Sequence, residues 1–347
     1  MPELSLTTFF NGASTAYFAI NAFNLLARPK PTRLQKLLGA VCVYWTLATA
    51  KDMLLLVPGG YTQRMLDAVL IADGWSAVTF ACVLFELTMP GWVTWRRTAL
   101  LALPFATFTA VYALAPCAAV ASAYMAFLAV FGLAVLLAGY FKAAVYMRYI
   151  YENFSDVERM DISWLKPVYV ADFVYMSLWV IVSLVNVPAA DSLIYVAGIV
   201  LWQITLHYCA DMKPVRPESY AETATGDIAG DEPEYAFAGQ MEDIVENEEL
   251  YLDPKLSLNQ LAERLGTNRT YLSKYFNNVK GTTFYDYVNA LRIHKKSVPL
   301  MQEHPEYAFD YIAQQSGFNS LSTFQRAFRK YTGTTPGKFI GIKCKED

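Results

Sequence analysis

The chain has 347 residues, of which 55% are hydrophobic and 17% charged, and its formal net charge is -3. With a mean hydropathy of +0.25 it is too apolar and too lightly charged for an ordinary soluble domain of this length. The apolar residues are concentrated before Met212, in runs near the ~20 residues needed to cross a bilayer. The sequence therefore predicts a membrane part followed by a polar part.

Seven apolar segments in the first part are predicted to cross the membrane as helices. The first of them, residues 4–26, is the most polar. It contains Asn11, Asn21 and Asn24, so we expect it to pack inside a bundle instead of facing lipid. It lacks the positively charged start of a secretory signal peptide and is interpreted as an uncleaved span. The other six predicted spans are residues 37–57, 66–89, 98–115, 119–146, 165–187 and 191–210.

The positive residues of the short loops predict the orientation of these spans. Ten of them lie in alternate loops, whereas the intervening loops contain only Arg64. Because Lys and Arg are retained on the cytoplasmic side, the N-terminus is expected outside the membrane and everything after Lys213 in the cytoplasm. This alternation requires an odd number of spans. The ten residues are Arg28, Lys30, Arg33, Lys36, Arg96, Arg97, Arg148, Arg159, Lys213 and Arg216.

The polar part begins with a predicted flexible acidic linker, residues 213–240, which is rich in proline and small polar residues. From Lys255 to the end, fourteen Lys and Arg stand against seven Asp and Glu, a net charge of +7. Such a basic module is expected of a protein that meets phosphate. The predicted domains are a transmembrane bundle (1–212), the linker (213–240) and a basic domain (241–347).

Two stretches of the basic domain repeat one pattern. "LAERLGTNRTYLSKYF", from Leu261, and "IAQQSGFNSLSTFQRAF", from Ile312, both place an alanine four residues before a glycine, then a polar turn, then a second apolar-periodic helix. The small alanine permits close helix approach, and the glycine supplies a turn conformation that other residues resist. The pattern predicts two helix-turn-helix motifs.

Local signals support these helix boundaries. Ser257 followed by Gln260 is a capping box ahead of the first helix. Gly333 is placed to end the last of the repeated helices, and Pro336 to begin another. The side chains expected to cap the other helices are those of Asn268, Asp310 and Ser320.

The outward faces of the second helix in each copy carry hydrogen-bonding groups. An α-helix fits the major groove, where Arg pairs with guanine and Gln with adenine. Two such helices about one DNA turn apart, roughly 34 Å, would read successive grooves of one duplex. The residues expected to contact DNA are Asn268, Arg269, Thr270, Ser273 and Lys274 in the first copy, and Asn319, Ser320, Ser322, Thr323, Gln325, Arg326 and Arg329 in the second.

The stretch from Leu250 to Ile342, somewhat over a quarter of the chain, resembles the DNA-binding domain of the AraC/XylS family of bacterial transcription regulators. "YIAQQSGFNSLSTFQRAFRKYTGTTP" carries the match, with "LAERLGTNRTYLSKYF" and "FYDYVNALRIHKK" in support. The resemblance implies a linking helix between the two motifs, binding to promoter DNA and, in an activator, contact with RNA polymerase. The chain departs from the family at Lys296, where a small residue is usual, and at Pro299, which predicts a bend in the linking helix.

Six ionisable residues lie within or beside the predicted spans, where charge is costly and often functional. Two interpretations stay open. In one, Lys51 pairs with Asp73 as a packing clamp and the others lie in the headgroup region. In the other, they form a ligand or proton site. The residues are Lys51, Asp52 and Asp73 toward the outer side, and Glu86, Asp172 and His207 toward the cytoplasmic side.

The sequence offers no pattern for catalysis. The five cysteines lack paired spacing and the three histidines are scattered, so neither a metal nor a cofactor is expected. No phosphate-binding glycine loop or nucleophile–base arrangement is present. The chain is therefore predicted not to be an enzyme.

These features predict an all-α protein with a seven-helix transmembrane bundle and a cytoplasmic domain of two helix-turn-helix motifs. It is interpreted as a one-component regulator that binds promoter DNA, alone or as a homodimer, in response to a small-molecule or membrane signal. Two alternatives stay open. The bundle is a transporter or receptor with a DNA-binding control module, or it serves only as an anchor in the bilayer.

Overall fold

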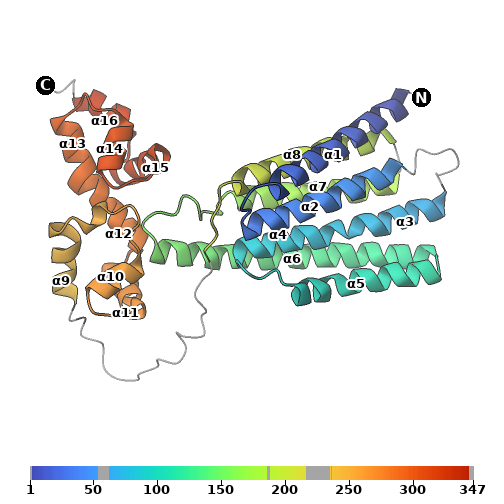
Figure 1. The fold of residues 1–347 in the computed structure, drawn as a ribbon, viewed down its shortest axis with the longest axis horizontal. Helices are drawn as coiled ribbons and strands as arrows, with labels where there is room; N and C mark the ends of the chain where they lie inside the picture. The colour runs from blue at the N-terminus through green and yellow to red at the C-terminus, as the bar shows by residue number, and fades with distance from the viewer. Residues whose placement is uncertain (1, 54–61, 186–187, 216–234, 236, 344–347) are drawn as a thin grey trace. The chain divides into compact units, whose positions relative to one another are not determined.

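The computed structural model describes residues 2–53, 62–185, 188–215, 235 and 237–343 (Figure 1). All regular elements among these residues are helices. The chain divides into a bundle unit, residues 1–146 and 162–216, and a C-terminal unit, residues 147–161 and 217–347. The stretch Met147–Asp161, which we call the inserted segment, thus belongs to the C-terminal unit although bundle helices precede and follow it in the sequence.

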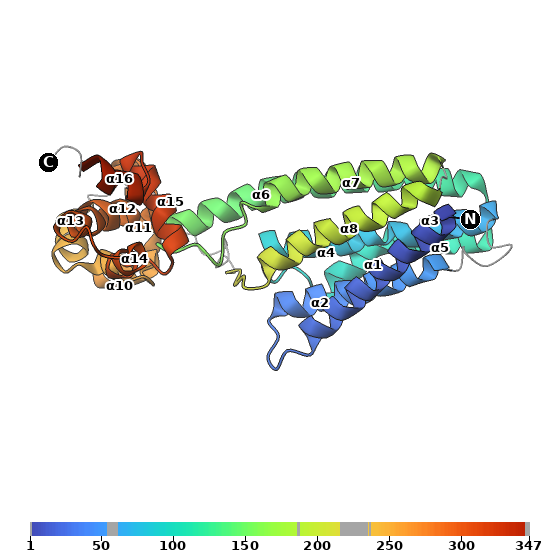
Figure 2. The same cartoon turned by 90° about the horizontal axis from the view of Figure 1, so that it is seen from above.

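The helices of the bundle unit lie side by side (Figures 1 and 2). Contacts join α1 to α2 and α8, α3 to α5, and α7 to α8. Threonine side chains cap the N-termini of several of these helices. The Thr32 hydroxyl, for example, accepts from the Gln35 amide in a capping box at the start of α2. The helices are α1 (Pro2–Leu26), α2 (Arg33–Lys51), α3 (Gln63–Gly74), α4 (Ser76–Thr88), α5 (Trp95–Leu114), α6 (Ala118–Asn153), α7 (Leu165–Val185) and α8 (Pro188–Cys209).

Five helical stretches of the described chain are long and apolar enough to cross a membrane. They coincide with the last five predicted spans. Helices α1 and α2 occupy the first two, but asparagines in α1 and charged residues at both ends of α2 make them more polar, so a count of seven is not confirmed. The five stretches are Gln63–Thr88, Trp95–Leu114, Ala118–Asn153, Leu165–Val182 and Ala190–Cys209.

Aromatic side chains fill the centre of the bundle. Phe18 stacks on Trp45 with ring centroids 5.4 Å apart, and Trp202 stacks on Phe80 at 5.2 Å. Trp45 and Trp202 pack edge to face at 5.9 Å, so these rings connect α1, α2, α4 and α8. On the outside of the bundle, large apolar side chains are exposed, for example those of Phe23 on α1, Leu100 on α5 and Phe141 on α6. Exposed apolar surface of this extent is typical of a membrane interaction.

The C-terminal unit has two hydrophobic cores, one for each helix-turn-helix motif. Leu261, Leu272 and Phe276 lie in the first, and Ile312 and Phe324 in the second. The helices are α9 (Ala238–Glu242), α10 (Leu258–Arg264), α11 (Arg269–Tyr275), α12 (Phe284–Leu291), α13 (Val298–Glu303), α14 (Phe309–Gln315), α15 (Leu321–Thr332) and α16 (Pro336–Lys343), with π-helices at Asp243–Asn247, Phe276–Lys280 and Arg292–Ser297 and a 3₁₀-helix at Leu250–Leu252.

Most of the predicted helix boundaries are confirmed. Ser257 and Gln260 form the capping box, Asn268 caps α11, Ser320 caps α15, and Gly333 ends α15 with φ 75°. The prediction for Asp310 is wrong. Helix α14 begins after Ala308, which offers no capping side chain, so Asp310 lies in the first turn and accepts from Gln314 instead.

The turn glycine of each motif has a left-handed backbone, with φ +62° at Gly266 and +81° at Gly317. At Gly317 a second constraint applies, because an added Cβ would lie 2.6 Å from the carbonyl oxygen of Leu252. Both alanines of the repeated pattern, Ala262 and Ala313, are buried in the cores as expected.

The linking helix is helical throughout from Phe284 to Glu303, but a π-helical turn, Arg292–Ser297, separates α12 from α13. This wider turn ends at Ser297, two residues before Pro299, whose ring would clash with the preceding turn of a regular α-helix. The Ser297 hydroxyl donates to the Arg292 carbonyl within it, at 2.9 Å. The departure at Pro299 is thus accommodated by a local change of helix type.

Candidate nucleic-acid interface and bundle cavities

The second helix of each motif, α11 or α15, carries the predicted DNA-contacting residues, and we call these the recognition helices. On α11, Lys274 is exposed, whereas Arg269, Thr270 and Ser273 are partly buried. On α15, the exposed side chains are those of Ser322, Gln325, Arg326 and Arg329, with Asn319 exposed just before the helix.

One predicted contact residue does not face outward. Thr323 is buried, and its amide and hydroxyl both lie within hydrogen-bond distance of the Ser320 hydroxyl, at 3.2 and 3.1 Å. Ser320 in turn is committed to capping α15. Because this capping position turns Thr323 inward, Thr323 is not available to DNA in this structure.

A buried arginine lies beside the first core. Arg292 donates to the carbonyl oxygens of Tyr251 and Asp253, each at 2.7 Å, and to the side-chain oxygen of Asn289 at 3.1 Å. It also donates to both oxygens of Ser155 in the inserted segment, at 3.1 and 3.3 Å. Burial lowers the pKa of Arg292 to about 10, so the guanidinium stays charged at neutral pH.

The inserted segment also contacts the second recognition helix. Asn319 donates to Asp156 at 2.5 Å, and Arg326 donates to Asp161 at 3.3 Å. Between them, Ser322 donates to Glu158 at 3.1 Å. All three donors are among the residues that the sequence predicts to contact DNA.

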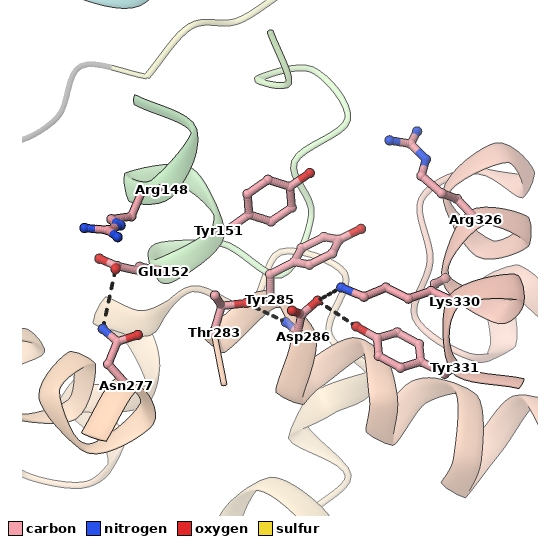
Figure 3. Close-up of a pocket in the computed structure, with 11 residues that line it drawn as sticks. Arg148, Tyr151, Glu152, Asn277, Thr283, Tyr285, Asp286, Arg326, Lys330 and Tyr331 are labelled. Carbon is pink, nitrogen blue, oxygen red and sulfur yellow. Dashed lines mark hydrogen bonds and ion pairs between the residues drawn. The ribbon is translucent and has the colours of Figure 1, made fainter. Parts of the chain in front are cut away.

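The same segment reaches the first motif. The Arg269 guanidinium lies over the Tyr149 ring, 5.6 Å from its centroid, and Asn277 donates to Glu152 at 3.4 Å. An open cavity of about 730 Å³ lies between the motifs, lined from one side by Arg148, Tyr151 and Glu152 (Figure 3). The other lining residues are Asn277, Thr283, Tyr285, Asp286, Arg326, Ala327, Lys330 and Tyr331.

The acids of the inserted segment are not among the site residues that the sequence predicts. In the sequence, this loop is notable for the positive charges of Arg148 and Arg159, which predict its cytoplasmic location. The signal was nevertheless present, since "SDVERMD" places three carboxylates within seven residues of a loop predicted to share the cytoplasm with a basic domain. Opposite charge alone could not have identified the surface that they contact.

In the bundle unit, Lys51 forms ion pairs with Asp52 and Asp73, each at 2.5 Å. The Tyr195 hydroxyl donates to Asp52 at 2.9 Å. Asp52, Asp73 and Tyr195 line a cavity of about 370 Å³, together with Asp191. The clamp expected between Lys51 and Asp73 is therefore present, and it borders a space that could hold a small molecule.

The other three predicted residues are not brought together with this group. Glu86 is buried and paired with Arg33 at 2.6 Å, which makes it a clamp of the bundle. Asp172 lines a separate cavity of about 50 Å³, and its Oδ1 has no hydrogen-bond partner among the described residues. His207 is exposed and lies against the Tyr208 ring.

Comparison with known proteins identifies the C-terminal region. Residues 261–341 match the family model described as "Helix-turn-helix domain". The chain is similar to an uncharacterized HTH-type transcriptional regulator of Staphylococcus aureus (strain COL), with 33% identity over 93 residues that cover 27% of this chain and 12% of the relative. It is also similar to the Msm operon regulatory protein of Streptococcus mutans, with 27% identity over 104 residues, covering 30% of this chain and 36% of the relative.

The family match lies at residues 261–341, and the chain spans well under half the length of either relative. No solved structure matches the chain. The chain carries an AraC-type helix-turn-helix domain at residues 261–341, preceded by a helical region long and apolar enough to span a membrane.

Proposed function

We propose that this chain is a membrane-embedded one-component transcription regulator of the bacterial inner membrane, whose C-terminal unit binds promoter DNA in the cytoplasm. The observation that carries the proposal is the pair of equivalent recognition helices. Each is capped, packed on its own core and lined with polar side chains on its outer face. The net charge of +7 from Lys255 onward would attract the phosphate backbone.

The exposed donors divide into two roles. Gln325 and Arg326 have the chemistry to pair with base edges, whereas Lys274 and Arg329 would hold phosphates. Recognition of DNA would then combine contacts from α15 to base edges with contacts from both recognition helices to the DNA phosphates. The relatives named as transcription regulators support this use of the domain.

The bundle would supply the signal. Its cavity of about 370 Å³ combines Asp52, Asp73 and Asp191 with aromatic walls from Trp45 and Trp179. This composition favours sensing over anchoring alone, because an anchor requires no polar cavity. Four carboxylates line the cavity, the fourth being Asp67, so its occupant would be cationic or rich in hydrogen-bond donors.

The central test is DNA binding by the full chain in lipid nanodiscs, measured by fluorescence anisotropy on a mixed-sequence duplex over a range of salt concentrations. We expect log Kd to rise linearly with log salt, and Arg329→Ala to reduce the slope by about 1. Lys338→Ala removes an exposed charge from α16, outside both recognition helices. It should reduce the slope of log Kd against log salt by less than Arg329→Ala does. Absence of binding at every salt concentration would refute the proposal.

The sensing role has its own test. After the DNA bound in cells is identified, the full chain is compared with its Asp73→Asn variant on a reporter driven by that promoter. Sensing predicts an altered response of the reporter with unchanged DNA affinity in vitro. An unchanged response would favour the anchor.

A further inference from the structure

We propose that the inserted segment, Met147–Asp161, is an internal competitor of DNA that covers the recognition helices and must leave them before promoter DNA can bind. This inference rests on the proposed function and assigns a means of regulation to the same site. All of the contacts that support it lie within the C-terminal unit.

The contacts follow one face of α15. Ser322 and Arg326 are four residues apart and so lie on one face of the helix, and Asn319 precedes its N-cap Ser320. Each is a donor, and each is paired with a carboxylate of the inserted segment, from Asp156, Glu158 and Asp161. The three carboxylates thus lie where phosphate oxygens or base acceptors would have to be.

The coverage extends to the first motif. Arg269 contacts Tyr149 through its guanidinium, and Asn277, just after α11, contacts Glu152. In the space between the motifs, the Tyr151 ring packs edge-on against Tyr285 with centroids 4.9 Å apart (Figure 3). A single stretch of chain therefore contacts both motifs that would bind one duplex.

The segment is held by a defined anchor. Phe154 pairs with Ser257 in an antiparallel bridge, and the Ser155 amide donates to the Leu256 carbonyl at 3.2 Å. Ser155 also accepts from buried Arg292. This anchor lies beside α10 and not on a recognition helix. The acids that follow it are exposed or partly buried, and so can separate while the anchor persists.

The carboxylate contacts are weak enough to be reversible. The Arg326 side chain remains 57% exposed, although that of Asp161 is only 12% exposed, and an ion pair with one partner open to solvent contributes little individually. Together, the three carboxylate contacts would lower the affinity for DNA by a modest factor. Because α6 extends into the inserted segment and ends at Asn153, a change in that helix would reach the covering residues along the chain.

The test uses the full chain in nanodiscs with a mixed-sequence duplex. The variant Asp156→Asn/Glu158→Gln/Asp161→Asn keeps side-chain size and removes three charges that face α15. We expect its Kd to fall roughly tenfold relative to the unchanged chain. The charge-matched control, Glu263→Gln/Glu303→Gln/Glu306→Gln, neutralises three exposed acids elsewhere in the same unit and should tighten binding only about twofold, through net charge.

A second measurement needs no substitution. Hydrogen exchange of the unchanged chain is compared with and without duplex, and the amides of residues 156–161 should exchange faster when DNA is bound. Equal tightening by both triple variants, or exchange at 156–161 that is unchanged or slower with DNA, would overturn competition while leaving DNA binding intact. If none of the three proteins binds the duplex at any salt concentration, the proposed function itself fails, and the competition with it.

Discussion

Arg292 and Ser155 are 137 positions apart, yet the guanidinium of the first donates to both the carbonyl and the hydroxyl oxygen of the second. The pair makes a residue of the inserted segment part of the interior of the C-terminal unit. Five acceptors in all receive hydrogen bonds from this one side chain. Its planar fork satisfies groups that would otherwise be buried without partners.

Arg292→Lys tests this role. Lysine has three donors on a single nitrogen and cannot reach the same acceptors, so we expect the opening free energy of the C-terminal unit to fall by about 2–4 kcal/mol. Hydrogen exchange of the α12 amides in the full chain measures it. Arg329→Lys, at an exposed position on α15, is the matched control and should stay within about 0.5 kcal/mol of the unchanged chain.

The two turn glycines predict unequal effects of the same substitution. Gly266→Ala adds a methyl group into open space, so only the left-handed backbone is penalised, by about 1–2 kcal/mol. Gly317→Ala carries the same penalty and also sets Cβ against the Leu252 carbonyl, for a total of about 3 kcal/mol or more. Amide exchange in α11 and α15 compares them. Equal losses of stability for the two variants would contradict the close approach of Gly317 to the Leu252 carbonyl.

Gln325→Ala addresses sequence readout. Gln325 is exposed on α15, and its side chain suits an adenine edge. At the promoter identified in cells, we expect the change to cost about 1–3 kcal/mol of binding and to relax the preference at one base pair. Affinity for mixed-sequence duplex should be unchanged. An equal loss of affinity for all DNA sequences would instead indicate that Gln325 contacts the phosphate backbone of the DNA.

Cys117 tests the membrane orientation. It is exposed between α5 and α6, in a loop that the charge pattern places outside, whereas Cys42, Cys82 and Cys209 are buried. A membrane-impermeant maleimide should therefore label the chain in intact spheroplasts, and Cys117→Ser should abolish the signal. Labelling of Cys117 only after lysis would reverse the predicted topology.

The sequence by itself determined the local features of the C-terminal unit. The capping positions at Ser257, Asn268 and Ser320 and the left-handed glycines depend on a few neighbouring residues, so they could be read without a fold. Apolar length likewise identified five of the helices that could cross a membrane. Asp310 failed as a cap because α14 begins at Phe309, two residues earlier than an N-cap at Asp310 would require.

Only the tertiary structure decided which distant groups meet. Nothing local distinguishes Ser155 from any other loop serine, because its partner Arg292 is supplied by another helix. The same holds for Asp161 against Arg326 and for the cavity lined by Asp52, Asp73 and Tyr195. A helix boundary is set by hydrogen bonds between near neighbours. A buried guanidinium or a covered recognition surface is instead set by packing and desolvation between segments more than a hundred residues apart, which no short window of sequence contains.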